Sequence, residues 1–269
     1  MDDTPPKAES RPEGARIREI PLRMVIPNLI TVLAICAGLS GIRLAFEHRF
    51  ETAVVMILAA AFLDGIDGRL ARMLKATSKF GAQMDSLADI VNFGVAPALV
   101  LYAFILIEAG SFGWIAALMF AIACALRLAR FNVMIEDPDL PAWQSEYFVG
   151  VPAPAGALLV MLPVYLGFLG VPLGQPAGLA ASVYTVGVAV LMVSRLRIFS
   201  GKSGQKIRRD LVMPLILLAV LYVLLLVNYT WYTLCGSAIA YLAFIPFSMR
   251  AYVRRKRREA AAAADAEAR

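Results

Sequence analysis

Eight long apolar segments, joined by short polar connections, dominate this 269-residue chain. Each has roughly 17 residues or more, the length that an α-helix needs to cross the hydrocarbon core of a membrane. The chain is 60% hydrophobic, whereas soluble domains are less apolar and show amphipathic stripes. We therefore predict an all-α integral membrane protein, a bundle of about eight transmembrane helices. The predicted spans are Val25–Phe46, Thr52–Leu74, Leu87–Ile107, Trp114–Met134, Ala155–Leu173, Ala177–Leu196, Leu211–Val227 and Trp231–Ala251.

The basic residues are distributed unevenly between the two sides of this predicted bundle. Of the 26 Lys and Arg residues, all but Arg43 and Arg49 fall at the termini, in the even-numbered connections or at the span ends beside them. Cytoplasmic loops of membrane proteins are enriched in Lys and Arg, so both termini are predicted to be cytoplasmic. The net charge of +6 is then explained by the basic residues that orient the chain in the membrane. Nucleic-acid binding is not indicated, because these residues flank apolar spans.

The sequence divides into one domain and two tails. Residues 1–14 are polar and contain Pro5, Pro6 and Pro12, a composition typical of a disordered tail. Residues 15–251 are predicted to form a single membrane-embedded domain. Residues 252–269 form a basic, alanine-rich C-terminal tail.

Four aspartates lie where the second predicted span ends and the third begins: Asp64, Asp67, Asp85 and Asp89. A carboxylate at the edge of a span is costly unless a partner compensates its charge. The spacings of three and four residues place each pair on one helix face, and a cytoplasmic hairpin would bring the pairs together. Converging carboxylates suit hard cations such as Mg²⁺ or Mn²⁺.

The bases near the aspartates allow an alternative interpretation, in which they only neutralise the acids at the membrane interface. These bases are Arg69, Arg72, Lys75 and Lys79. Among them, Arg72 offers a planar, permanently charged fork that suits a phosphate. Gly68 and Gly81 would let a ligand approach the backbone, although glycine is also common where membrane helices pack.

The order of these residues resembles the CDP-alcohol phosphotransferases, membrane enzymes that move a phosphatidyl or similar group from a CDP-linked lipid to an alcohol. The motif is Asp-x-x-Asp-Gly-x-x-Ala-Arg, eight residues, then Gly-x-x-x-Asp-x-x-x-Asp. Every fixed position is matched, and the eight residues are Met73–Phe80. The matching residues are Asp64, Asp67, Gly68, Ala71, Arg72, Gly81, Asp85 and Asp89.

Four further segments, together with the eight-span layout, resemble the phosphatidylserine synthase branch of this family. They are Asp85–Pro97, Arg127–Asn132, Gly150–Pro154 and Phe199–Lys202. In the first segment, Asn92 stands where many members of the branch have serine. The resemblance implies transfer of a phosphatidyl group from CDP-diacylglycerol to L-serine, giving phosphatidylserine and CMP. It also implies a homodimer in a bacterial-type plasma membrane, with the active site facing the cytoplasm.

The resemblance also implies roles for individual residues. Asp64 and Asp85 would bind both of two Mg²⁺ or Mn²⁺ ions, Asp67 the first ion and Asp89 the second, and Asp89 would be the general base. The residues implied to contact the CDP-lipid are Gly68, Ala71, Arg72, Ser78, Gly81, Asn28 and Thr31. The candidates for serine binding are Asn92, Arg127, Arg130, Asn132 and Lys202.

Two other functions remain open at this point. A sibling transferase could use glycerol 3-phosphate or inositol phosphate, because the same arginines could hold a phosphate or the serine carboxylate equally well. A divalent-cation or proton-coupled transporter is the alternative from another class. Transporter sites lie near the bilayer midplane, often between inverted repeats, whereas these acids cluster at the predicted cytoplasmic edge and no repeat is evident.

Overall fold

The computed structural model describes residues 22–135, 147–199 and 209–267, which are almost entirely helical. The N-terminal tail and Lys202 lie outside the described residues. The longer helices are α1 (Leu22–Phe46), α2 (Phe50–Met73), α3 (Lys79–Asp89), α4 (Ala96–Phe104), α5 (Ser111–Ile135), α8 (Gln175–Val193), α9 (Arg209–Asn228) and α10 (Thr230–Glu267). The shorter elements are a π-helix (Ile90–Val95), a 3-10 helix (Leu106–Ala109), α6 (Ala153–Val160), α7 (Leu162–Phe168), β1 (Tyr147–Val149) and β2 (Arg197–Phe199).

Six helices in the described part of the chain are long and apolar enough to cross a membrane. They correspond to six of the eight predicted spans. The prediction of a helical integral membrane protein is therefore supported. The other two predicted spans, Thr52–Leu74 and Ala155–Leu173, are also helical, but their helices are not both long and apolar enough to be counted. The α2 helix carries acids and bases near its C-terminal end, and the helical stretch Ala153–Phe168 is shorter.

The fifth predicted span, Ala155–Leu173, is not one continuous helix. The structure places α6 and α7 there, separated at Met161, and α7 ends at Phe168. Pro163 explains the break, because proline has no N–H to donate to the carbonyl of the residue four positions earlier.

The third predicted span, Leu87–Ile107, begins earlier and is not regular throughout. It comprises α3, the π-helix and α4, so helical structure runs from Lys79 to Phe104. The prediction began too late because the sequence before Asp85 is too polar to be counted as part of an apolar span. Pro97 follows the π-helix at the start of α4, and it removes an N–H from the α-helical hydrogen-bond pattern, which favours a local change of helix type.

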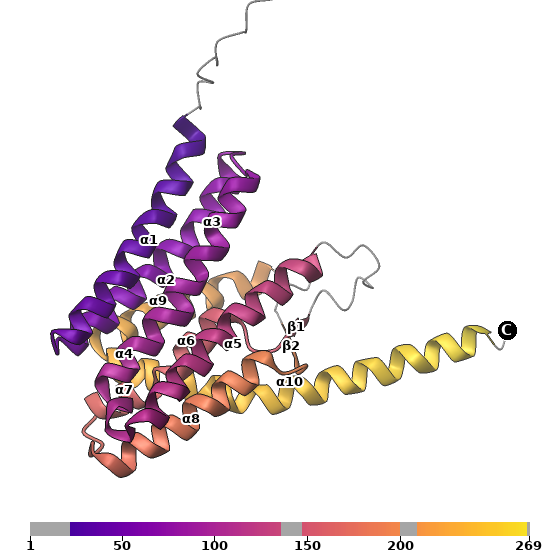
Figure 1. Ribbon diagram of the computed structural model, residues 1–269. Helices are drawn as coiled ribbons and strands as arrows, with labels where there is room; N and C mark the ends of the chain where they lie inside the picture. Colours follow the sequence, from indigo (N-terminus) through magenta and orange to yellow (C-terminus); the bar gives the residue numbers. More distant parts are fainter. Residues whose placement is uncertain (1–21, 136–146, 200–208, 268–269) are drawn as a thin grey trace, which may run out of the picture.

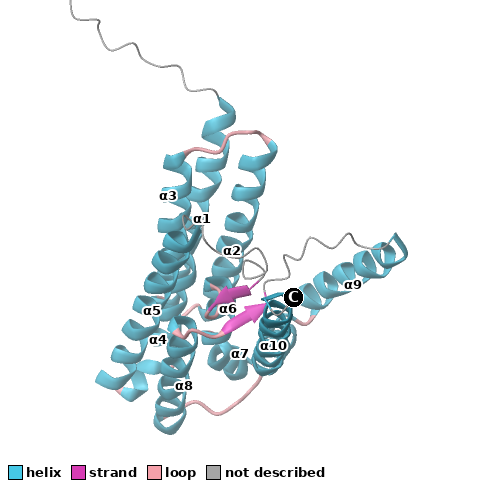
Figure 2. Ribbon diagram, turned by 90° about the vertical axis from the view of Figure 1, so that its right-hand side faces the viewer, coloured by secondary structure: helices cyan, strands magenta, loops and turns pink. Residues whose placement is uncertain are grey.

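The first three helices lie side by side and extend beyond the rest of the bundle at one end (Figures 1 and 2). Short-range signals set the turn between α2 and α3. Lys75 has a positive φ of 51°, and the Ala76 N–H donates to the Ala71 carbonyl at 2.9 Å, an arrangement that satisfies terminal carbonyls of a helix. Ser78 then caps α3 by accepting from the Gly81 N–H at 3.0 Å. This turn sets the C-terminal end of α2 beside the start of α3.

The two strands form a short antiparallel ribbon, in which Phe148 pairs with Ile198. Gly150 follows β1 with a φ of 75°, and a Cβ there would lie 2.1 Å from the Met192 carbonyl oxygen. Glycine is therefore required at this position. Two segments that carry the family resemblance, Gly150–Pro154 and Phe199–Lys202, begin at opposite ends of this ribbon. The Gly150 N–H donates to the Leu196 carbonyl at 2.7 Å, whereas Phe199 pairs with Tyr147, and the rest of its segment lies outside the described residues.

The core lies between α4, α5, α6 and α8, where Leu101, Phe120, Leu159 and Met192 are fully buried. In contrast, α9 is apolar and exposed along almost its whole length and packs mainly on α10. Figure 2 shows α9 standing away from the other helices. The last helix, α10, continues to Glu267, so the predicted C-terminal tail begins as an extension of the last span.

Candidate metal and nucleotide site

The four aspartates converge as the hairpin prediction requires. Asp64 and Asp67 lie on α2, whereas Asp85 and Asp89 lie on α3. One carboxylate oxygen from each of Asp64, Asp67 and Asp85 lies within 4.8 Å of the other two. The carboxyl of Asp89 lies beside that of Asp64, close enough for a hydrogen bond if one of the two carries a proton. Two helix ends thus form one cluster of acids.

The cluster fits a divalent cation. Asp67 is only 2% exposed, and Oδ1 of Asp64 is buried with no hydrogen-bond partner among the described residues. A buried carboxylate oxygen without a partner is costly, and coordination to a cation would satisfy it. An all-oxygen ligand set matches Mg²⁺ and Mn²⁺.

The interpretation that nearby bases simply neutralise the acids finds little support. Within the part of the chain that the structure describes, no ion pair joins Arg69, Arg72, Lys75 or Lys79 to the aspartates. Arg72 does lie near enough to Asp85 for their charges to interact. The cluster therefore retains a net negative charge that a cation can balance.

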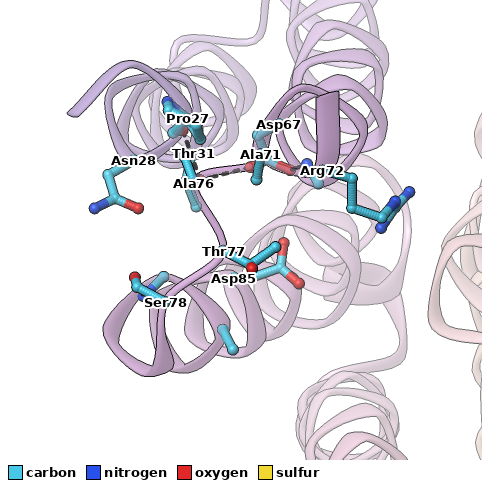
Figure 3. Close-up of a pocket in the computed structure, with 13 residues that line it drawn as sticks. Pro27, Asn28, Thr31, Asp67, Ala71, Arg72, Ala76, Thr77, Ser78 and Asp85 are labelled. Carbon is cyan, nitrogen blue, oxygen red and sulfur yellow. Dashed lines mark hydrogen bonds between the residues drawn. The ribbon is translucent and has the colours of Figure 1, made fainter. Parts of the chain in front are cut away.

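A pocket of about 180 Å³ opens beside the aspartates, between α1, α2 and α3 (Figure 3). Its lining includes all seven residues for which the sequence predicted contacts with a CDP-lipid: Asn28, Thr31, Gly68, Ala71, Arg72, Ser78 and Gly81. Asp67 and Asp85 also line it, together with Pro27, Ala76, Thr77 and Ala82. Sequence reasoning missed these last four residues, which carry no charge and occupy no fixed position of the motif. The structure thus gathers the predicted residues, while their contact with a nucleotide stays a prediction.

Thr31 has a contact that the sequence did not reveal. Its hydroxyl donates to Oδ2 of Asp67 at 2.6 Å, and also lies 3.1 Å from the Pro27 carbonyl oxygen. This contact links α1 to the acid cluster. No spacing rule could have indicated it, because Thr31 and Asp67 lie on different helices.

The candidates for serine binding do not all lie together. Arg127 is buried, lies close enough to Asp89 for their charges to interact, and stacks over Phe131 at 5.1 Å. Arg130 instead donates through Nη1 to the Val193 carbonyl at the end of α8, at 2.8 Å. Arg127 is therefore the candidate next to the proposed base.

The two asparagines have other neighbours. Nδ2 of Asn132 donates to Oγ of Ser86 at 3.0 Å, which places Asn132 next to α3. Asn92 is 1% exposed, and its side-chain oxygen lies against Gly38 of α1, where an added Cβ would approach it to 2.5 Å. Among the described residues, neither amide forms a hydrogen bond with an aspartate. Tyr241 on α10 also lies near Arg127, and no motif in the sequence pointed to it.

Together, the apolar helices, the acid cluster and the adjoining pocket describe a membrane protein with an oxygen-ligand metal site beside a binding pocket. The sequence profile of the CDP-alcohol phosphatidyltransferase family matches residues 24–194. That match covers well over half of the chain, and the chain belongs to this family. A second profile, CDP-alcohol phosphatidyltransferase 2, matches residues 210–246.

The chain is similar to several named proteins, and each of the three that follow is named CDP-diacylglycerol–serine O-phosphatidyltransferase. The protein of Mycobacterium leprae is 46% identical over 192 residues, 70% of this chain and 61% of that protein. The protein of Mycobacterium bovis is 41% identical over 239 residues, 84% of this chain and 78% of that protein. The protein of Helicobacter pylori strain 26695 is 37% identical over 203 residues, 74% of this chain and 82% of that protein. The match therefore spans about three fifths of the Mycobacterium leprae protein.

Proposed function

We propose that this protein transfers a phosphatidyl group from CDP-diacylglycerol to L-serine, releasing CMP and forming phosphatidylserine. The observation that carries the proposal is the convergence of Asp64, Asp67 and Asp85 beside the pocket between α1, α2 and α3. Family membership supplies the class of donor. The names of the relatives supply the acceptor.

In this proposal the aspartates bind the metal ions and the pocket binds the nucleotide part of the donor. Asp64 and Asp85 would hold both of two Mg²⁺ or Mn²⁺ ions, with Asp67 on the first and Asp89 on the second. When bound, such ions neutralise pyrophosphate oxygens and stabilise the charge that develops on them. The pocket beside Asp67 and Asp85 would receive the cytidine and pyrophosphate groups, with the guanidinium of Arg72 against a phosphate.

Asp89 would act as the general base, because the serine hydroxyl must lose its proton as it attacks phosphorus. It lies on the side of the cluster near Arg127, whereas the pocket lining includes Asp67 and Asp85 but not Asp89. Arg127 would hold the serine carboxylate there. Asn92, Arg130, Asn132 and Lys202 complete the proposed acceptor set.

We further propose that all eight predicted segments cross the membrane and that both termini are cytoplasmic. The distribution of Lys and Arg supports this orientation. It places the acid cluster and the pocket at the cytoplasmic face of a bacterial-type plasma membrane. Residues 15–251 would form the single catalytic domain, and two copies would form a homodimer, as is usual in the family.

An acceptor screen tests this function. Purified protein is supplied with CDP-diacylglycerol and, in parallel, serine, glycerol 3-phosphate or inositol phosphate, and CMP release is measured. Serine should support the fastest release. If a phosphorylated acceptor is preferred, the chain is a sibling transferase and the serine assignment is wrong.

Chelation tests the metal requirement in the same assay. Excess EDTA should abolish CMP release, and either Mg²⁺ or Mn²⁺ should restore it, because uncompensated aspartates would repel the pyrophosphate. Full activity in EDTA would contradict the metal site.

A further inference from the structure

Thr31 and Asp67 form a hydrogen bond between two helices in a place that excludes water. Thr31 on α1 is 4% exposed and Asp67 on α2 is 2% exposed. The distance from Oγ1 to Oδ2 is 2.6 Å, within the range of hydroxyl bonds to ionised oxygens. If this bond were lost, water could not readily replace it at such a buried position.

We propose that Thr31 is a positioning residue for the metal site and not primarily a nucleotide contact. Its hydroxyl fixes Oδ2 of Asp67, while Oδ1 of the same carboxylate accepts from the Gly68 N–H. A carboxylate oxygen has a second lone pair, which Oδ1 can offer to a cation. The proposal rests on the metal site of the proposed function but not on the identity of the acceptor. It changes the role predicted for Thr31 from the sequence, which was contact with the CDP-lipid.

The hydrogen-bond inventory of threonine supports this assignment. A hydroxyl has one proton to donate, and the acceptor at 2.6 Å is a carboxylate, whereas the Pro27 carbonyl oxygen lies farther away at 3.1 Å. The proton is therefore committed to Asp67. A ribose or phosphate in the pocket would have to take its hydrogen bonds from other donors, such as Arg72.

The bond also explains how α1 can affect the metal site without supplying a ligand. Asp67 lies at the buried side of α2, and Thr31 is the partner that holds it from the facing helix. Partners that orient a metal ligand contribute typically 10–100-fold to metal affinity. Loss of the hydroxyl should thus weaken cation binding before it weakens lipid binding.

The test measures Mn²⁺ binding directly, by electron paramagnetic resonance of the purified protein without either substrate. Thr31→Val keeps the shape of the side chain and removes the hydroxyl, and the Mn²⁺ Kd should rise roughly 10-fold or more. Thr31→Ser should restore the wild-type Kd. At saturating Mn²⁺, the KM for CDP-diacylglycerol of Thr31→Val should stay within about twofold of the wild type, since the pocket keeps its other donors.

Ser40→Ala is the matched control, because it removes a hydroxyl of the same helix that donates to the Cys36 carbonyl. It should leave the Mn²⁺ Kd unchanged. A double-mutant cycle then separates positioning from a general packing defect. If Thr31 acts through Asp67, adding Thr31→Val to Asp67→Asn should raise the Kd no further.

Three results would overturn the proposal: an unchanged Mn²⁺ Kd in Thr31→Val, no restoration by Thr31→Ser, or additive effects in the cycle. A raised KM for CDP-diacylglycerol with unchanged Mn²⁺ binding would instead support the role predicted from the sequence, in which Thr31 contacts the CDP-lipid. None of these measurements involves serine. Failure of the acceptor assignment would therefore be seen separately, in the acceptor screen.

Discussion

Asp89 has different neighbours from the other three aspartates. It lies beside Asp64 and close to Arg127, whose charge acts on Asp89 and not on Asp64 or Asp85. Like Asp64, it does not line the pocket that Asp67 and Asp85 border. A group that must take a proton from the acceptor needs access to the acceptor side of the reacting phosphorus. The position of Asp89 at the far side of the cluster suits that role.

Substitution of Asp89 by asparagine should separate chemistry from binding. Asp89→Asn keeps the size of the side chain but removes the base, so CMP release should fall by roughly 10²-fold or more. Binding of CDP-diacylglycerol, measured by filter binding or calorimetry, should persist. Glu51→Gln, at the opposite end of α2 from the cluster, is the control and should keep full activity. Turnover by Asp89→Asn at the wild-type rate would exclude Asp89 as the base.

The two arginines of α5 should respond differently to replacement by lysine. Arg127 is buried near Asp89, whereas Arg130 donates to the Val193 carbonyl. Lysine keeps the charge but loses the two-pronged donor geometry that suits a carboxylate. Arg127→Lys should therefore raise the KM for serine and leave the KM for CDP-diacylglycerol nearly unchanged.

Arg130→Lys serves as the comparison and should change the KM for serine less than Arg127→Lys does. Steady-state kinetics with each substrate varied in turn would measure both values. A larger effect at Arg130 would place the serine carboxylate nearer the end of α8.

Among the elements, the π-helix Ile90–Val95 is one of the places where the third predicted span packs against α1. Asn92 lies on this π-helix and is buried against Gly38 of α1. The glycine leaves room for the amide, because a Cβ at position 38 would approach Oδ1 of Asn92 to 2.5 Å. This close packing helps to hold α1 near the acid cluster.

Enlarging Gly38 should destabilise the protein through Asn92. Gly38→Ala should lower the free energy of unfolding by about 1–3 kcal/mol, the usual cost of overpacking. In the background of Asn92→Ser, which shortens the side chain, Gly38→Ala should lower the free energy of unfolding by less. Denaturant titration of the detergent-solubilised protein would measure this coupling. If Gly38→Ala lowers the free energy of unfolding equally in both backgrounds, Asn92 is not the side chain with which the added methyl group clashes.

The sequence predicted some elements well and others poorly, for physical reasons. The apolar segments and the spacing of Asp64, Asp67, Asp85 and Asp89 were sufficient to predict helices and a convergent acid cluster, because both depend on local periodicity. The break at Met161 and the π-helix depend on how single prolines alter backbone hydrogen bonds. The bond between Thr31 and Asp67 depends on tertiary packing, which no local pattern specifies.

At the scale of the whole molecule, α9 and α10 differ from the rest of the bundle. Although α9 is apolar, none of its residues from Leu211 to Asn228 is buried inside the structure. Its contacts with α10 include a hydrogen bond between the hydroxyls of Tyr222 and Ser237, at 3.0 Å. Surrounding lipid would keep the apolar surface of such a helix away from water.

The proposed topology predicts which sites can be labelled from outside the cell. In a variant without Cys36, Cys124 and Cys235, a cysteine at His48 should react with a membrane-impermeant maleimide in intact cells. A cysteine at Arg254 should react only after permeabilisation, because it follows the last span on the cytoplasmic side. Labelling of both sites from outside would mean that an odd number of segments between them does not cross. The eight-span arrangement would then be wrong.

The order of the helices along the chain has a consequence for biosynthesis. The four aspartates and Thr31 all come from α1, α2 and α3, the first three helices of the described chain. Synthesis proceeds from the N-terminus, so these three helices enter the membrane first, and we expect the cation site to assemble while the later helices are still being inserted. Lesions in α8 to α10 would then reduce the amount of mature enzyme in the membrane and leave the cation affinity of the surviving molecules unchanged.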